Sequence, residues 1–161
     1  MRSTVHRIAI VIMALSLMGP RAAATTRVPF RALIDTEPMM VGFCGPGCLQ
    51  LEIRGTGQAT HIGRTEVAGP SQVNVILGQQ TGTSTLTAAN GDTIVIAFAG
   101  TVDFEGPNPT DPVSFQGEWH VLAGTGRFEA AEGAGTYSGT AAGSAGNLLL
   151  VGSVSSPGGI D

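Results

Sequence analysis

The chain has 161 residues, with twelve Asp or Glu, eight Arg and no Lys, and its formal net charge is −4 at pH 7. Nucleic-acid binding takes most of its affinity from basic side chains that contact phosphates, so this charge balance excludes nucleic acid as an expected partner. The same charge disfavours an anionic membrane surface and favours a dispersed protein.

The first residues have the three parts of a secretory signal peptide. Arg2 and Arg7 give a positive start, residues 8–18 form an apolar run, and residues 22–24 are all Ala. A signal peptidase recognises such small residues, so we expect cleavage after Ala24 and a secreted or periplasmic protein. The apolar run is shorter than the about 20 residues that a membrane-spanning helix needs. The alternative to a signal peptide is a buried N-terminal helix. No other stretch is long and apolar enough to span, so we expect no membrane partner after signal removal.

Two cysteines, Cys44 and Cys48, enclose the tripeptide Gly45-Pro46-Gly47. An exported protein meets an oxidising compartment, and this insert can turn the chain tightly enough to join the sulfurs, so we expect a disulfide. A redox pair normally has two intervening residues, and a metal site needs further ligands that do not cluster here. Free thiols are the remaining alternative. The bridge closes a short loop, so its stabilisation lies at the low end of about 2–4 kcal/mol.

The rest of the chain alternates apolar with polar residues and has Gly or Thr every few positions, a pattern that predicts strands and no helix. The clearest hairpin turns at Asn90-Gly91, since Asn-Gly tolerates the positive φ angles of a type I′ turn. The expected strands, in chain order, are residues 27–34, 49–67 (one strand, or two joined at residues 55–57), 71–77, 82–88, 93–102, 113–122, 134–142 and 147–154.

Seven or eight short strands with short turns and no linker predict one all-β domain over residues 25–161, after a signal peptide over residues 1–24. We expect a small antiparallel β-barrel of about eight strands, with a β-sandwich as the alternative. The many glycines favour the barrel, because Gly permits tight bends and a close approach of strands.

Three segments together resemble those of a known protein family. The first is Gly124-Thr125-Gly126-Arg127-Phe128, followed by small residues and Gly133. The second is Ala-Thr-His-Ile-Gly at residues 59–63, and the third is the hairpin at residues 85–92. Their order and spacing resemble the allene oxide cyclase and dirigent barrel group, in particular bacterial exported proteins that share its signature. The resemblance spans residues 49–154.

This resemblance implies an eight-stranded antiparallel barrel with a lumen. Plant members of the group are cyclases, or proteins that steer a reactive intermediate, and they often assemble as trimers, so a homo-oligomer is an implied alternative to a monomer. The glycine-rich turn shapes the barrel in that group. The catalytic polar residues lie elsewhere, and none of them aligns with a residue of this chain. Fold does not imply function, so the resemblance alone does not bring a cyclase activity here.

His61 is the first candidate for catalysis. If residues 53–67 form a strand, His61 shares a face with Ala59 and Gly63, small neighbours that leave room for it in a lumen. An imidazole in a lumen can act as an acid, a base or a ligand anchor near neutral pH. The alternative is a core histidine that hydrogen-bonds to neighbouring strands, because buried polar groups are usually satisfied in this way.

Two carboxylates are further candidates. Glu118 and His120 share one face of a strand as an acid–base pairing, but with Trp119 in the core both point to solvent. Asp103 lies near a strand end, either as a carboxylate at the barrel mouth or as a cap for the next turn. With two histidines after the signal and both cysteines in the expected bridge, we predict no metal site and no cofactor.

Three functions follow as alternatives. The leading prediction is a barrel that binds a small apolar or amphiphilic molecule, because an eight-stranded barrel can just hold one small ligand and this chain has little bulk to fill it. The second is a cyclase or isomerase in which His61, with Asp103 or Glu118, transfers protons. The third is an extracellular structural or interaction protein with a solid core.

Overall fold

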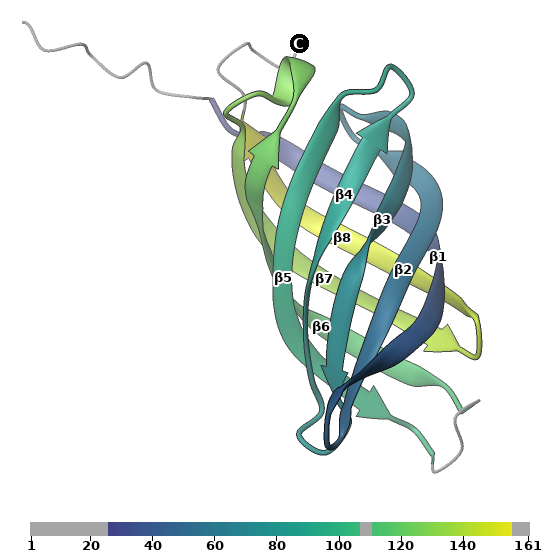
Figure 1. Ribbon diagram of the computed structural model, residues 1–161. Helices are drawn as coiled ribbons and strands as arrows, with labels where there is room; N and C mark the ends of the chain where they lie inside the picture. Colours follow the sequence, from purple (N-terminus) through teal and green to yellow (C-terminus); the bar gives the residue numbers. More distant parts are fainter. Residues whose placement is uncertain (1–25, 107–110, 156–161) are drawn as a thin grey trace, which may run out of the picture.

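A computed structural model describes residues 26–106 and 111–155, and it confirms the all-β prediction (Figure 1). Each strand pairs antiparallel with the next in the chain, and β1 also pairs with β8, so the sheet closes into an eight-stranded barrel. This closure excludes the β-sandwich. The strands are β1 (Val28–Gly45), β2 (Cys48–Ala59), β3 (Gly63–Asn74), β4 (Gln79–Ala88), β5 (Thr93–Phe104), β6 (Val113–Gly124), β7 (Glu132–Ala142) and β8 (Ala145–Ser155).

The expected signal peptide, residues 1–24, lies outside the described residues. The described part of the chain contains one short 3₁₀ helix, η1 (Gly126–Phe128), between β6 and β7. No helix there is long and apolar enough to cross a membrane.

The first long strand turns at a different place from the one predicted. The segment over residues 49–67 is two strands, and they join at residues 60–62 and not at residues 55–57. Thr60 fixes this turn on β1, because its backbone N–H donates to Arg31 O at 2.9 Å and its Oγ1 accepts from Arg31 N at 2.9 Å. Side-chain hydrogen bonds of this kind offer the backbone an alternative to the strand ladder.

Two other turns also differ in detail from the prediction. The strand expected over residues 71–77 ends at Asn74, whose Oδ1 accepts at 3.0 Å from the backbone N–H groups two and three residues later. The hairpin at Asn90-Gly91 is confirmed, but only Gly91 has a positive φ, 88°, so the turn is not the expected type I′.

One half of the barrel interior is packed. Because the chain runs up and down, the connections after β2, β4 and β6 meet at one end of the barrel, and the buried apolar side chains gather toward this end. Trp119 lies among them, with its ring 5.6 Å from the Phe30 ring and its Nε1 donating to Thr136 O at 3.0 Å. The cluster comprises Phe30, Ala32, Ile34, Ala59, Ile62, Val67, Leu86, Ala88, Ile94, Ile96, Trp119, Phe128, Ala131, Tyr137, Leu150 and Val154.

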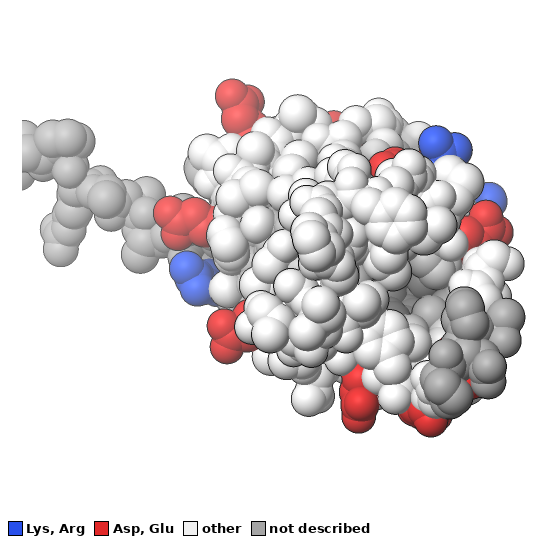
Figure 2. All heavy atoms as spheres, turned by 60° about the horizontal axis from the view of Figure 1, so that its bottom comes forward, with Lys and Arg blue, Asp and Glu red and all other residues white. Residues whose placement is uncertain are grey.

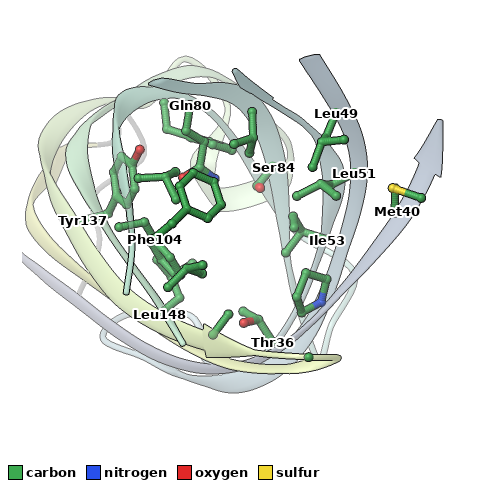
Figure 3. Close-up of a pocket in the computed structure, with 18 of the residues that line it drawn as sticks. Thr36, Met40, Leu49, Leu51, Ile53, Gln80, Ser84, Phe104, Tyr137 and Leu148 are labelled. Carbon is green, nitrogen blue, oxygen red and sulfur yellow. The ribbon is translucent and has the colours of Figure 1, made fainter. Parts of the chain in front are cut away.

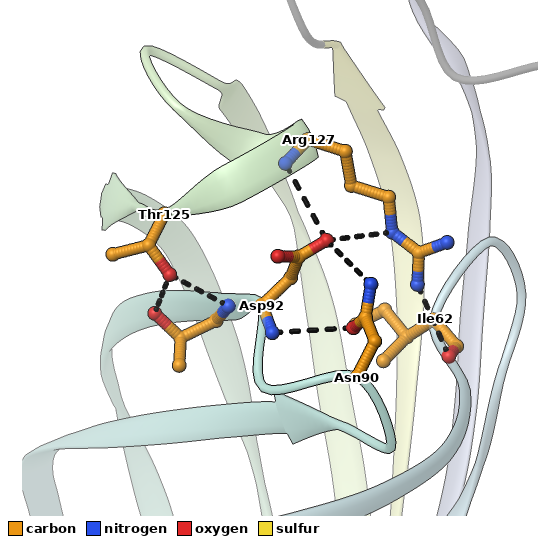
Figure 4. A network of polar contacts seen from close by, with 6 residues as sticks. Ile62, Asn90, Asp92, Thr125 and Arg127 are labelled. Carbon is orange, nitrogen blue, oxygen red and sulfur yellow. Dashed lines mark hydrogen bonds and ion pairs between the residues drawn. The ribbon is translucent and has the colours of Figure 1, made fainter.

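The glycine-rich segment after β6 closes this packed end (Figure 4). Thr125 joins it to the start of β5, because its Oγ1 accepts from Thr93 N at 3.0 Å and its N–H donates to Thr93 O at 2.9 Å. Gly126 has a positive φ of 60°, which glycine adopts without strain. The following 3₁₀ turn places Phe128, fully buried, in the packed cluster.

Arg127 ties the same segment to two neighbouring turns (Figure 4). Its Nε lies 3.5 Å from Asp92 Oδ2, and its Nη2 donates to Ile62 O at 3.4 Å. Asp92 is held in turn by Asn90, whose Nδ2 donates to the same carboxylate oxygen at 2.9 Å. Three chain connections therefore form one polar network over the closed end, on the outside of the apolar cluster.

Candidate functional site

The other half of the barrel encloses a cavity of about 370 Å³ (Figure 3). It opens at the end formed by the connections after β1, β3, β5 and β7, and small-molecule pockets span about 300–1,000 Å³. Its walls are mostly apolar, since inward positions of the strands carry Leu, Ile, Val and Phe. The apolar lining includes Leu49, Leu51, Ile53, Val73, Phe98, Val102, Phe104, Val113, Phe115 and Leu148.

Tyr137 lies on the floor of the cavity, where the open half meets the packed half. Ile96, Tyr137 and Leu150 belong both to the packed cluster and to the cavity lining. The Tyr137 ring contacts two aromatic walls, with its centroid 5.5 Å from Phe98 and 6.3 Å from Phe115. The residue is 4% exposed, and burial raises the pKa of Tyr137 to about 12. Its hydroxyl therefore stays neutral over the physiological range.

A few polar groups interrupt the apolar lining. Thr36, Gln80, Ser84 and Asp111 line the cavity together with Tyr137. Gln80 is held by a buried neighbour on β3, since its Nε2 donates to Ser71 Oγ at 3.1 Å. Among the described residues, Gln80 Oε1 and the Tyr137 hydroxyl are the two buried side-chain polar atoms without a hydrogen-bond partner. An apolar cavity with a few polar groups at set positions is the usual form of a small-molecule site.

The disulfide between Cys44 and Cys48 is confirmed, with a Cα–Cα distance of 5.1 Å. It joins the end of β1 to the start of β2 at the open end of the barrel. The turn after β3 packs beside it, because Val75 N donates to Gly47 O at 2.8 Å. The bridge therefore holds one side of the cavity mouth, and it fits a protein that matures in an oxidising compartment.

Exposed apolar side chains lie at the open end of the barrel, on the last part of β1, the turn after β3 and the end of β5, and we call them the apolar rim. Figure 2 looks toward this end, where the surface is mostly uncharged and the acidic side chains lie around its periphery. Soluble monomers seldom leave several large apolar side chains exposed together, so such a rim marks a contact surface or the entrance of a ligand groove. The rim comprises Met39, Met40, Val41, Phe43, Val75, Ile76, Leu77 and Phe104.

No family model, curated protein or solved structure matches this chain. The resemblance to the allene oxide cyclase and dirigent group rests on the three sequence segments and stays a prediction.

The predicted inward position of His61 is wrong. His61 lies in the turn between β2 and β3 at the closed end, with a positive φ of 64°, and not on a strand face. Its Nε2 lies 3.0 Å from Pro29 O, so the ring pins this turn to the start of β1. The alternation of small residues around His61 suggested a continuous strand, and the hydrogen bonds of Thr60 end that strand first.

The two candidate carboxylates also lie away from the cavity. Glu118 and His120 are exposed on either side of the buried Trp119, as one of the two predicted alternatives had it. Asp103 is exposed on the outer face of β5, next to the inward Val102. A cyclase or isomerase needs ionisable groups that converge on one ligand, and none of His61, Asp103 and Glu118 lines the cavity. Within the described ranges, no three His, Cys, Asp or Glu side chains form a group that could hold a metal ion.

Tyr137 and Gln80 were not among the predicted site residues. A signal for Tyr137 was present, because it is the only Tyr of the chain and occupies a strand of Gly, Ala, Ser and Thr. Its inward neighbours two residues away on either side, Gly135 and Gly139, leave it as the one bulky group on that face. No comparable signal marks Gln80.

Replacing His61 by Ala is expected to destabilise the barrel by about 1 kcal/mol while ligand binding is kept. The loss comes from the hydrogen bond to Pro29 O, and the strained φ of the turn remains. His61→Gly also loses the bond but removes the strain, so its unfolding midpoint in urea should lie above that of His61→Ala. A ligand affinity that falls with His61→Ala at unchanged stability would contradict this purely structural role.

Proposed function

We propose that this chain binds one small apolar or amphiphilic molecule in the open half of its barrel. The apolar cavity of about 370 Å³ carries the proposal. A ligand that covers the side chains of Leu51, Ile53 and Phe115 removes apolar surface from water on both partners, and each Å² so removed contributes about 25 cal/mol. A protein with a solid core would instead fill both halves of its barrel with side chains.

The apolar rim supports this function because it extends the cavity lining outward. A ligand that touches Ile76 or Phe43 at the rim begins to leave water before it enters the barrel. The formal charge is negative, and an anionic ligand gains nothing from it. The confirmed disulfide supports the further proposal that binding takes place outside the cytoplasm, in a secreted or periplasmic protein.

Filling the cavity tests this function directly. Ser84 is buried on β4 and its side chain lines the cavity, so Ser84→Phe adds a ring to the empty space. We expect this variant to bind an apolar, environment-sensitive dye at least about tenfold more weakly, a loss of about 1.4 kcal/mol of binding free energy. Dye fluorescence in a titration with purified protein measures the affinity.

The matched control is Ser84→Ala, which leaves the cavity open and should bind the dye as the unchanged chain does. Both variants should keep the unfolding midpoint, since the new ring enters a cavity and displaces no packed side chain. Equal dye binding by Ser84→Phe and Ser84→Ala would place the dye elsewhere on the protein and would overturn the proposed site.

A further inference from the structure

Tyr137 and Gln80 are brought together by a row of paired residues that crosses four strands. Gln80 on β4 lies opposite Gly100 on β5. Gly100 in turn lies opposite Gly117 on β6, and Gly117 lies opposite Tyr137 on β7. The two residues between Tyr137 and Gln80 therefore have no side chains, and Figure 3 shows both polar residues on the same side of the cavity.

The Tyr137 ring uses the space that these glycines leave. A Cβ atom on Gly117 would lie 2.7 Å from Tyr137 Cε1, and one on Gly100 would lie 2.6 Å from the Tyr137 hydroxyl oxygen. These distances are too short for any real side chain, so glycine is required at both positions. The ring thus lies across β6, and its hydroxyl reaches β5, the strand that pairs with Gln80.

Gln80 and Tyr137 both line the cavity, and their unpartnered atoms form a complementary hydrogen-bonding pair buried in its wall. Gln80 donates its amide nitrogen to the fully buried Ser71, which leaves Oε1 as an acceptor without a partner. The Tyr137 hydroxyl can donate one hydrogen bond and accept others, and it has no partner either. Buried polar groups are nearly always hydrogen-bonded, so two such orphans on one lining point to a ligand that completes them.

We propose that the ligand is an uncharged apolar alcohol, which binds with its hydroxyl between Tyr137 and Gln80 and its apolar part toward the mouth. The ligand hydroxyl donates to Gln80 Oε1 and accepts from the Tyr137 hydroxyl, so both orphan atoms are satisfied at once. An ionised carboxylate cannot donate to Gln80. The described lining also has no Arg to pair with a carboxylate, and its charged member is the carboxylate of Asp111.

This inference rests on the proposed function, and the test separates the two. The probes are 1-decanol, its isomer methyl nonyl ether and decanoate, each titrated against the dye-loaded full chain. The ether keeps the oxygen acceptor and the apolar length but has no donor for Gln80. We expect decanol to displace the dye at an about tenfold lower concentration than either the ether or decanoate.

Two variants test the two proposed hydrogen bonds of the ligand hydroxyl. Gln80→Met keeps the length of the side chain and removes the acceptor, and Tyr137→Phe removes the hydroxyl alone. Gln80→Met should reduce the preference for decanol over the ether from about tenfold to about threefold or less, with ether binding unchanged. Tyr137→Phe should weaken decanol and the ether by a similar factor of about three or more and so keep the preference, because the oxygen of either probe accepts from this hydroxyl. The matched control is Gln79→Met, since Gln79 is the exposed neighbour on the same strand and should keep the preference.

The outcomes are distinct. Equal displacement by decanol and the ether, in a chain that binds both, overturns the alcohol assignment and leaves the proposed function standing. A decanol preference that survives Gln80→Met, or decanol binding that Tyr137→Phe leaves unchanged, overturns it as well, with both variants folded by Trp119 fluorescence. A chain that binds neither the dye nor any probe refutes the proposed function itself.

Discussion

Replacing Phe128 by Ala is expected to lower the free energy of unfolding by about 3–5 kcal/mol, the cost of removing a buried phenyl group. Phe128 is fully buried and lies in the packed cluster directly under the turn that closes the barrel. A cavity there cannot collapse easily, because Thr125 and Arg127, just before Phe128 in the chain, tie this segment to β5 and to the turn after β2. Since small domains are stable by about 5–15 kcal/mol, the loss is a large part of the total.

Urea denaturation followed by the fluorescence of Trp119, the only Trp of the chain, measures this change. The control is Phe43→Ala, because Phe43 is 72% exposed on the apolar rim and its loss should change stability by less than about 0.5 kcal/mol. If the two variants unfold at the same urea concentration, the closing turn does not depend on its buried ring.

Raising the pH from 10 to 12 is expected to destabilise the barrel by about 2 kcal/mol through Tyr137 alone. In the unfolded chain the phenol loses its proton near pH 10, whereas in the folded barrel burial raises the pKa of Tyr137 to about 12. The unfolded state therefore ionises first. Stability is fully present below pH 10 and falls as the pH rises toward 12, by about 1.4 kcal/mol for each pH unit.

The amino-acid composition allows the ionisation of Tyr137 to be measured without overlap from other side chains. The chain has one Tyr and no Lys, both cysteines are in the disulfide, and Arg stays charged throughout the range. The near-ultraviolet absorbance of phenolate thus reports Tyr137 alone, and thermal unfolding at each pH gives the stability. Tyr137→Phe should lack the alkaline loss, and a phenol that titrates near pH 10 in the folded protein would contradict the buried floor position.

Much of the fold could be predicted from residues close together in the chain. Strand alternation predicted seven or eight strands, and Cys44 with Cys48 predicted the disulfide, because strand periodicity and short loop closure are local properties. The glycines favoured the barrel over the sandwich, and the pairing of β1 with β8 confirms it. The errors were at turns. His61 was placed on a strand because small residues continue the alternation. A hydrogen bond from Thr60 to Arg31, far along the chain, instead ends the strand at Ala59.

The sequence by itself determined the strand faces, the glycine-rich turn and the negative charge, all of which depend on residue type and local spacing. Only the tertiary structure decided which half of the barrel is packed and which is hollow. It also decided that Tyr137 reaches toward Gln80, 57 residues earlier in the chain, because that arrangement depends on the register of three strand pairings and on the two glycines between them. The register is set by pairing across the sheet, and the alternation along one strand does not predict which residues of two strands lie opposite each other.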